Sequence, residues 1–169
     1  MALLLRELQI DDKESALAAH AEFPDWQFLN FYTEGMDWAE FVEENKRASQ
    51  GIDLAKGRVR HTFLLAEVEG MLVGRSSIRH ELNTYLKNYG GHIGYGVRPE
   101  FRGRGYAKEI LRQSLGYIRR LGVSEVLVTC FDENVASARV IESCGGELEN
   151  IVELDGKALR RYWIRQLQR

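Results

Sequence analysis

Hydrophobic and polar positions follow a helical period in the first third of the chain. Apolar residues recur at helical spacing over residues 11–22 and again over residues 37–50, which predicts two helices. Asp11 or Asp12 can cap the first helix, because a short carboxylate accepts from the free N–H groups of a helix start. The apolar run from Leu3 to Ile10 predicts a strand that precedes both helices.

From His61 the pattern changes to that of strands. Thr62–Val68 and Met71–Ile78 predict two strands that are joined by a tight turn at Glu69-Gly70, and residues 92–97 predict a third. The chain between the second helix and these strands is polar, so we expect a connection there.

Helices and strands alternate in the second half of the chain. Helices are expected over residues 103–121 and 134–143, with the strand Val126–Phe131 between them. Because this strand is nearly all apolar or β-branched, it is expected to be central and buried on both faces. Residues 147–154 and 158–164 predict a final hairpin.

The predicted order of elements is therefore β-α-α-β-β-β-α-β-α-β-β. Hairpin strands combined with one β-α-β crossover predict an α/β (α+β) fold, with a mixed, mostly antiparallel sheet flanked by helices. This order differs from the repeated crossovers of a doubly wound dinucleotide-binding sheet. No linker or repeat interrupts the pattern, so we expect a single domain over residues 1–169.

Composition limits the function classes. The 169 residues are 44% apolar and carry a net charge of −2, which fits a globular chain and does not favour a nucleic-acid partner. The start of the chain lacks the pattern of a signal peptide, and no apolar run approaches the ~18 residues of a membrane span. Two cysteines make no disulfide framework. We therefore expect a soluble, cytoplasmic protein without a membrane partner.

The most informative stretch is residues 97–107, which reads VRPEFRGRGYA. Its two glycines and two of its arginines stand where the helix of residues 103–121 begins. A helix start carries unpaired N–H groups and partial positive charge, glycines allow close approach to the backbone, and arginines add fixed charge. The stretch therefore predicts a cradle for a pyrophosphate.

Two common phosphate motifs are absent from the sequence. No string matches the P-loop pattern GxxxxGK[ST]. The dinucleotide pattern GxGxxG fails at Pro99 when it starts from Gly94, and fails at Lys108 when it starts from Gly103. The pattern that remains is Arg-x-x-Gly-x-Ala, which ends at Ala107.

The order of these motifs resembles the GNAT superfamily of acyl-CoA-dependent N-acetyltransferases. The cradle, its helix, the apolar strand and a short helix that opens at Asn134 follow one another as they do in that superfamily. Residues 134–145, which read NVASARVIESCG, resemble the version of the fourth helix found in the branch that acetylates ribosomal-protein N-termini. The stretch Ile93-Gly94-Tyr95 is similar to that branch as well, and the resemblance covers nearly all of the chain.

The resemblance implies that acetyl-CoA is the cosubstrate. The backbone amides of the cradle would bind the pyrophosphate, aided by its arginines. Asn134 would face the pantetheine arm and also cap its helix. The residues expected to bind the cofactor are Val97, Arg102, Gly103, Arg104, Gly105, Tyr106, Ala107, Asn134 and Ser137.

The family's chemistry requires a donor for the oxyanion and a proton for the leaving thiolate. A splayed strand supplies a backbone N–H in the family, and Gly94 and Gly96 would permit a bulge that aims the Val97 amide at the thioester. Many relatives use a tyrosine of the fourth helix as the acid, where this chain has Ile141. Water, Cys144 or a tyrosine elsewhere remain as sources of the proton.

The acceptor amine must lose a proton before it attacks, because a free alkyl amine titrates near ~10.4. His92 and Glu81 are the candidate bases, since both stand close to the predicted strands that flank the site, and His80 lies next to Glu81. The string HELNT mimics the start of a zinc motif, but Thr84 replaces the second histidine, so no metal site is predicted.

The aromatic segment of residues 23–32 joins two helices that wall the acceptor side in this family. Acidic residues around it favour a cationic amine. A small amine, an aminoglycoside-like amine, a protein or peptide N-terminus and a lysine side chain all remain open as acceptors, and a homodimer is allowed. Two alternatives to an enzyme of this kind are a non-catalytic acyl-CoA-binding module and an enzyme that binds ATP or NAD.

Overall fold

The structure is a computed structural model that describes residues 2–166. The predicted order of strands and helices is confirmed. The elements are β1 (Leu3–Glu7), α1 (Lys13–Ala21), α2 (Trp38–Gln50), β2 (His61–Val68), β3 (Met71–Arg79), β4 (Ile93–Val97), α3 (Tyr106–Arg120), β5 (Glu125–Phe131), α4 (Val135–Ser143), β6 (Glu147–Leu154) and β7 (Lys157–Arg165). Three short helices were not expected. They are the 3₁₀ helices η1 (Ile10–Asp12) and η3 (Pro99–Phe101) and the π-helix η2 (Leu86–Gly90).

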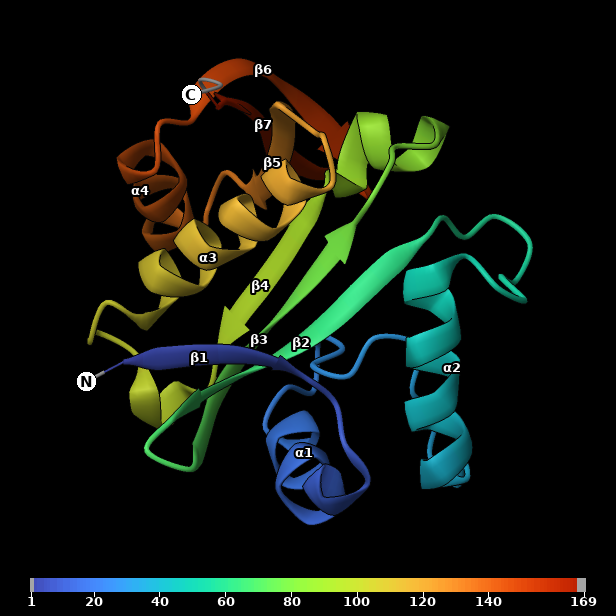
Figure 1. Cartoon of the computed structure of the whole chain (residues 1–169). Coiled ribbons are helices and arrows are strands. Elements are labelled where there is room, and N and C mark those ends of the chain that lie inside the picture. The colour runs from blue at the N-terminus through green and yellow to red at the C-terminus, as the bar shows by residue number, and fades with distance from the viewer. Residues whose placement is uncertain (1, 167–169) are drawn as a thin grey trace.

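The described strands form two antiparallel sheets. The first has the order β1-β2-β3-β4 and the second the order β5-β7-β6. Helices α1 and α2 cover one face of the first sheet, while α3 and α4 lie on the opposite side (Figure 1). No helix within residues 2–166 is long and apolar enough to cross a membrane. The fold is therefore an α/β domain of antiparallel sheets flanked by helices.

The prediction that residues 126–131 form the central strand of a sheet is wrong, because the strand has a paired neighbour on one side only. Strand β5 pairs only with β7 and stands at one edge of the second sheet. Its link to the first sheet is at His92, whose N–H donates to Leu127 O at 2.7 Å. The apolar run is still buried, with Val126, Leu127 and Val128 fully enclosed. The expected mixed sheet is thus split between β4 and β5.

The starts of α1 and α2 differ from each other in their capping. Asp37, which was expected to be the first residue of α2, caps it instead, because its side chain accepts from Glu40 N at 2.9 Å. The prediction was that Asp11 or Asp12 caps α1. Asp12 stands at the N-cap position, but its side chain does not cap the helix, since the carboxylate accepts from Gln9 N at 2.7 Å and pairs with Arg6 at 2.7 Å. An ion pair to β1 is available to Asp12, and it uses the oxygens that a cap would need.

Strand register decides which side chains of the first sheet face α1 and α2. Residues directly opposite on paired strands share a face, and successive residues alternate. The buried Phe63 and Leu65 pack among α1 and α2, so their partners in β3 and β4 face the same way. That face includes His61, Arg75, Ser77, Arg79, Gly94 and Gly96. Ile78 and Tyr95 point to the opposite face, against the core that includes α3 and α4.

Candidate active site

The cradle is the bend between η3 and α3. Gly103 has φ +76° and Gly105 has φ +82°, which is the left-handed region that glycine adopts most easily. A Cβ at either position would meet no atom within 4 Å, so both glycines border open space. The first hydrogen bond of the helix runs from Glu109 N to Gly105 O at 3.2 Å.

The amides of the cradle are free. Within residues 2–166, no hydrogen bond uses the N–H groups of residues 103–108 as donors, whereas Arg102 N donates to Pro99 O at 3.3 Å. A row of unpaired N–H groups at the positive end of a 15-residue helix is a site for an anion. Tyr106 and Ala107 are partly buried against the core beneath the cradle, so they anchor the helix start.

Both arginines of the cradle are exposed, and each donates to a backbone carbonyl of the segment that precedes it. Arg102 Nε donates to Val97 O at 3.1 Å, and its guanidinium carbon is 5.8 Å from the ring centre of Phe23. Arg104 Nη2 donates to Glu100 O at 3.4 Å. Neither guanidinium forms an ion pair with a described carboxylate within 4.0 Å, so their charges add to the field of the helix.

The Val97 amide points to the split between the sheets. Arg98 N donates to Val73 O at 2.8 Å, which makes these two residues a hydrogen-bonded pair of the antiparallel ladder. The next pair, Gly74 and Val97, is then non-hydrogen-bonded, and the Val97 N–H is directed away from β3. The bulge expected at Gly94 and Gly96 is absent, because the register from Ile93 to Val97 is continuous. The separation of β5 from β4 leaves this edge open without a bulge.

The start of α4 is linked to β4. Asn134 Oδ1 accepts from Ser137 N at 3.1 Å, which confirms the predicted cap and leaves the amide NH₂ group of Asn134 for another partner. Ser137 Oγ lies 2.8 Å from the hydroxyl of Tyr95, and burial raises the pKa of this phenol to about 12. A protonated tyrosine therefore stands beside the N-terminus of α4. Strand alternation could have placed the Tyr95 side chain there.

The position of the family tyrosine belongs to the core. Ile141 is fully buried among side chains of α3, α4 and the second sheet, and its Cγ2 fills the space beside Gly146. Cys144 is a partly buried free thiol whose pKa burial raises. A raised pKa keeps this thiol protonated.

We predict that Ile141→Tyr destabilises the protein instead of supplying an acid. A phenol is larger than the sec-butyl group, and overpacking a filled core costs about 1–3 kcal/mol. Urea unfolding should show this loss, and the rate of acetyl transfer should not rise. Val140→Tyr, at a partly buried neighbour, is the matched control and should lose less stability. A faster and equally stable Ile141→Tyr enzyme would contradict the prediction.

The prediction of His92 as a general base is not supported. Its side chain is 4% exposed, and Nδ1 accepts from Leu127 N at 2.9 Å. Burial is the main cause that lowers its pKa to about 4. The imidazole is thus neutral, and its Nδ1 lone pair is used to join the two sheets. His92 acts as a structural link where the split between β4 and β5 is closed by hydrogen bonds to Leu127.

Glu81 and His80 lie in the loop after β3. Glu81 is exposed, and it does not line the cavity described below. His80 Nε2 is 2.7 Å from Thr62 Oγ1, and that hydroxyl is 3.2 Å from the Tyr117 hydroxyl. His80 is therefore part of a network that links β2 to α3. Glu81 remains a prediction that no contact supports.

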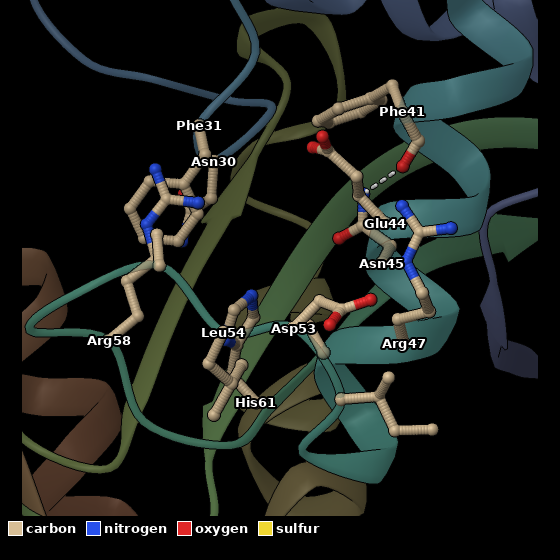
Figure 2. Close-up of a pocket in the computed structure, with 13 residues that line it drawn as sticks. Asn30, Phe31, Phe41, Glu44, Asn45, Arg47, Asp53, Leu54, Arg58 and His61 are labelled. Atoms are coloured by element: carbon tan, nitrogen blue, oxygen red, sulfur yellow. Dashed lines mark hydrogen bonds between the residues drawn. The ribbon is translucent and has the colours of Figure 1, made fainter.

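A cavity of about 220 Å³ lies beside the C-terminal half of α2. Figure 2 shows Phe31 and Arg58 on one side of it, with the Arg58 guanidinium 3.7 Å from the ring centre, and Glu44 on the helix opposite. Asn30 lines the cavity as well, so the aromatic segment of residues 23–32 does reach it. Other aromatics of that segment, such as the fully enclosed Phe28, are core residues.

His61 lines this cavity and was not singled out from the sequence. Its Nδ1 is 2.9 Å from Val59 O, and a carbonyl only accepts, so Nδ1 carries the proton and Nε2 keeps its lone pair. Burial is the main cause that lowers the pKa of His61. A neutral imidazole with a free Nε2 is a candidate base. No local pattern marks this residue, because the cavity is formed by distant segments.

Comparison with known proteins shows which family the sequence matches. The family profile described as "Acetyltransferase (GNAT) domain" matches residues 2–147. The chain belongs to the GNAT acetyltransferase family. The uncharacterised N-acetyltransferase YnaD of Bacillus subtilis (strain 168) is 26% identical over 133 residues, which are 73% of this chain and 74% of YnaD.

Solved structures share the fold of this GNAT acetyltransferase. One is yncA of Salmonella typhimurium with its cofactor acetyl-CoA, at 16% identity and a TM-score of 0.67, covering 100% of this chain and 96% of that one. Another is the Salmonella typhimurium enzyme that modifies the N-terminal serine of ribosomal protein L7/L12, at 19% identity and a TM-score of 0.70, covering 98% and 95%. The resemblance to GNAT enzymes predicted from the motifs is thus confirmed.

Proposed function

We propose that this protein transfers an acetyl group from acetyl-CoA to a primary amine by direct attack within a ternary complex. One observation carries the proposal: the unpaired amides of residues 103–108 form an anion site at the start of α3. Neighbours that are acetyltransferases, among them yncA with acetyl-CoA, support the choice of cosubstrate.

The residues of the cradle would hold the cofactor by its phosphates. The amides of Gly103 and Gly105 and of the residues after them meet the pyrophosphate, and Arg102 and Arg104 exchange their present carbonyl partners for phosphate oxygens. Asn134 and Ser137 face the pantetheine arm from the opposite side of the split. The Val97 amide, directed into the split, donates to the oxyanion.

Proton transfer completes the reaction. The amine nitrogen attacks the carbonyl carbon, the C–S bond breaks, and the sulfur leaves as a thiolate that takes a proton. Tyr95 is our candidate for this proton, because its hydroxyl stays protonated at neutral pH beside α4. The amine loses its proton to water, and a chain of water molecules would carry it to the lone pair of His61 Nε2, because His61 pairs with Arg79 about 17 Å along the sheet from the level of Val97.

Two further parts of the proposal concern extent and location. The profile match ends at residue 147, but β6 and β7 complete the sheet that contains β5, so we propose one acetyltransferase domain over residues 1–169.

Cys130 and Cys144 are free thiols, which supports a reducing compartment such as the cytoplasm. A homodimer remains a prediction without a contact to support it.

The test measures binding and turnover separately. We expect acetyl-CoA to raise the melting temperature, and ATP or NAD to leave it unchanged. We expect a panel of amines to release free CoA thiol in an amine-dependent way. Stabilisation by acetyl-CoA without any amine-dependent release would leave the non-catalytic acyl-CoA-binding module as the function. Stabilisation by ATP or NAD alone would overturn the cofactor.

A further inference from the structure

Arg75 of β3 is a buried cation without a carboxylate partner. It is 2% exposed, and its guanidinium donates to three uncharged oxygens, which are Gly94 O at 3.1 Å, Gln27 O at 2.9 Å and Asn30 Oδ1 at 3.0 Å. Its Nε is buried and has no hydrogen-bond partner among the described residues. The guanidinium also stacks on an uncharged ring, since its carbon is 3.9 Å from the ring centre of Trp26.

A second arginine of the same strand face lies nearby. Arg79 is partly exposed, and Nη1 donates to Gly90 O at 3.2 Å. A Cβ built on Gly94 would be 3.4 Å from Arg79 Nη1 and 3.7 Å from Arg75 Nη1. Two guanidinium groups therefore border one glycine of β4. A Cβ at Gly94 would be in van der Waals contact with both of them.

No acid in the part of the chain that the structure describes balances this pair of charges. Neither Arg75 nor Arg79 has a carboxylate oxygen within 4.0 Å. The other arginine buried to this degree, Arg161, pairs with Glu149. A buried charge without a partner is unfavourable, and two like charges repel each other. An anionic ligand would relieve both penalties.

The position of the pair separates it from the cradle. Arg75, Arg79 and Gly94 face α1 and α2, whereas the fourth helix and its asparagine lie on the other side. Gly94 is three residues from Val97 in the same strand, which is about 10 Å along β4. A ligand held by the arginines would thus reach the strand edge at which the acetyl group is transferred.

We propose that the acceptor carries a carboxylate, or a similar oxyanion, that binds Arg79 with Arg75 as the second positive charge. The amine and the anion belong to the same molecule and lie within about 10 Å of each other. Two sources fit this chemistry, a free amino acid and a peptide whose N-terminal residues are acidic. This inference rests on the proposed N-acetyltransferase function. It reverses the preference for a purely cationic amine that the acidic residues near the aromatic segment suggested.

The experiment compares acceptors that differ only in the anion. L-methionine is paired with L-methioninamide, and the peptide Ser-Asp-Ala-amide with Ser-Asn-Ala-amide, at a pH above the amine pKa of all four. For the unmutated protein we expect kcat/KM to be at least 10-fold higher for the acidic member of one pair. Arg79→Gln should lower that value about 10- to 100-fold and change the value of the neutral member less than about 3-fold.

Two other variants serve as references. Arg79→Lys keeps the charge but not the planar donor fork, so its loss should be intermediate. Arg120→Gln removes an exposed arginine at the far end of α3 and should leave both acceptors of a pair unchanged. Thermal unfolding of each variant, with acetyl-CoA as ligand, shows that the fold and the cofactor site persist.

The outcomes distinguish this inference from the proposed function. Amine-dependent CoA release without a preference within either pair, or equal losses for both members in Arg79→Gln, would overturn the anion site and leave the N-acetyltransferase intact. Absence of amine-dependent release from every acceptor would overturn the function itself. A preference confined to the amino-acid pair identifies a small-molecule acceptor, and one confined to the peptide pair identifies an acidic N-terminus.

Discussion

Gly105→Glu is expected to weaken acetyl-CoA binding by more than about 100-fold while the protein remains folded. A glutamate at this position meets open space, so it does not disturb packing. Its carboxylate stands among the unpaired amides of residues 103–108 and competes with the phosphates for them. It also repels the phosphates directly, over a few ångströms. Isothermal titration of acetyl-CoA into the variant measures the loss.

Backbone strain has to be separated from charge in this experiment. Gly105 has φ +82°, and any residue with a Cβ pays about 1–2 kcal/mol there. Gly156 in the β6–β7 turn has φ +81° and equally open surroundings, so Gly156→Glu is a matched control. We expect it to lose similar stability and to bind acetyl-CoA normally. A folded Gly105→Glu protein with undiminished affinity would refute the cradle.

The elements that depend on local pattern could be predicted from the sequence. Helix α2 and the final hairpin follow from spacing and turn residues alone. The cradle is also local, because its glycines, arginines and helix start are contiguous. The position of β5 in its sheet could not be predicted, since a strand that is covered by helices has the same apolar sequence pattern at the edge of a sheet as at its centre. Its pairing with β7 joins residues that are 28 to 40 positions apart.

Long-range neighbours explain what sequence reasoning missed in the site. Gly96 was taken to permit a bulge, but the space that its missing side chain leaves is occupied by the ring of Trp26. Arg75 and Arg79 carry no motif, and their lack of acidic partners is visible only once the strands are paired. His92 was chosen for the usual pKa of a free imidazole. Its burial against β5 removes that basis.

His92 should make the protein sensitive to acid. Burial is the largest cause that holds its pKa at about 4 in the folded state, below the 6.5 of an unperturbed imidazole. The folded state therefore prefers the neutral ring. The stability that this preference contributes is fully present above pH 6.5 and is lost as the pH falls from about 6.5 towards 4. A difference of about 2.5 units corresponds to about 3 kcal/mol.

His92→Gln isolates this contribution from that of the other groups. An amide oxygen can accept from Leu127 N but does not titrate in this range, so the free energy of unfolding should fall about 3 kcal/mol less between pH 7.5 and pH 4 than in the unmutated protein. His20→Gln is the matched control, because His20 Nδ1 accepts from Leu29 N at 3.1 Å in a less buried position, and its effect should be smaller. Urea unfolding at a series of pH values measures both. If the free energy of unfolding of His92→Gln and of the unmutated protein changed in parallel with pH, the junction between β4 and β5 would tolerate a charged imidazole. The hydrogen bond from His92 N to Leu127 O would then hold the two strands together there without the side chain.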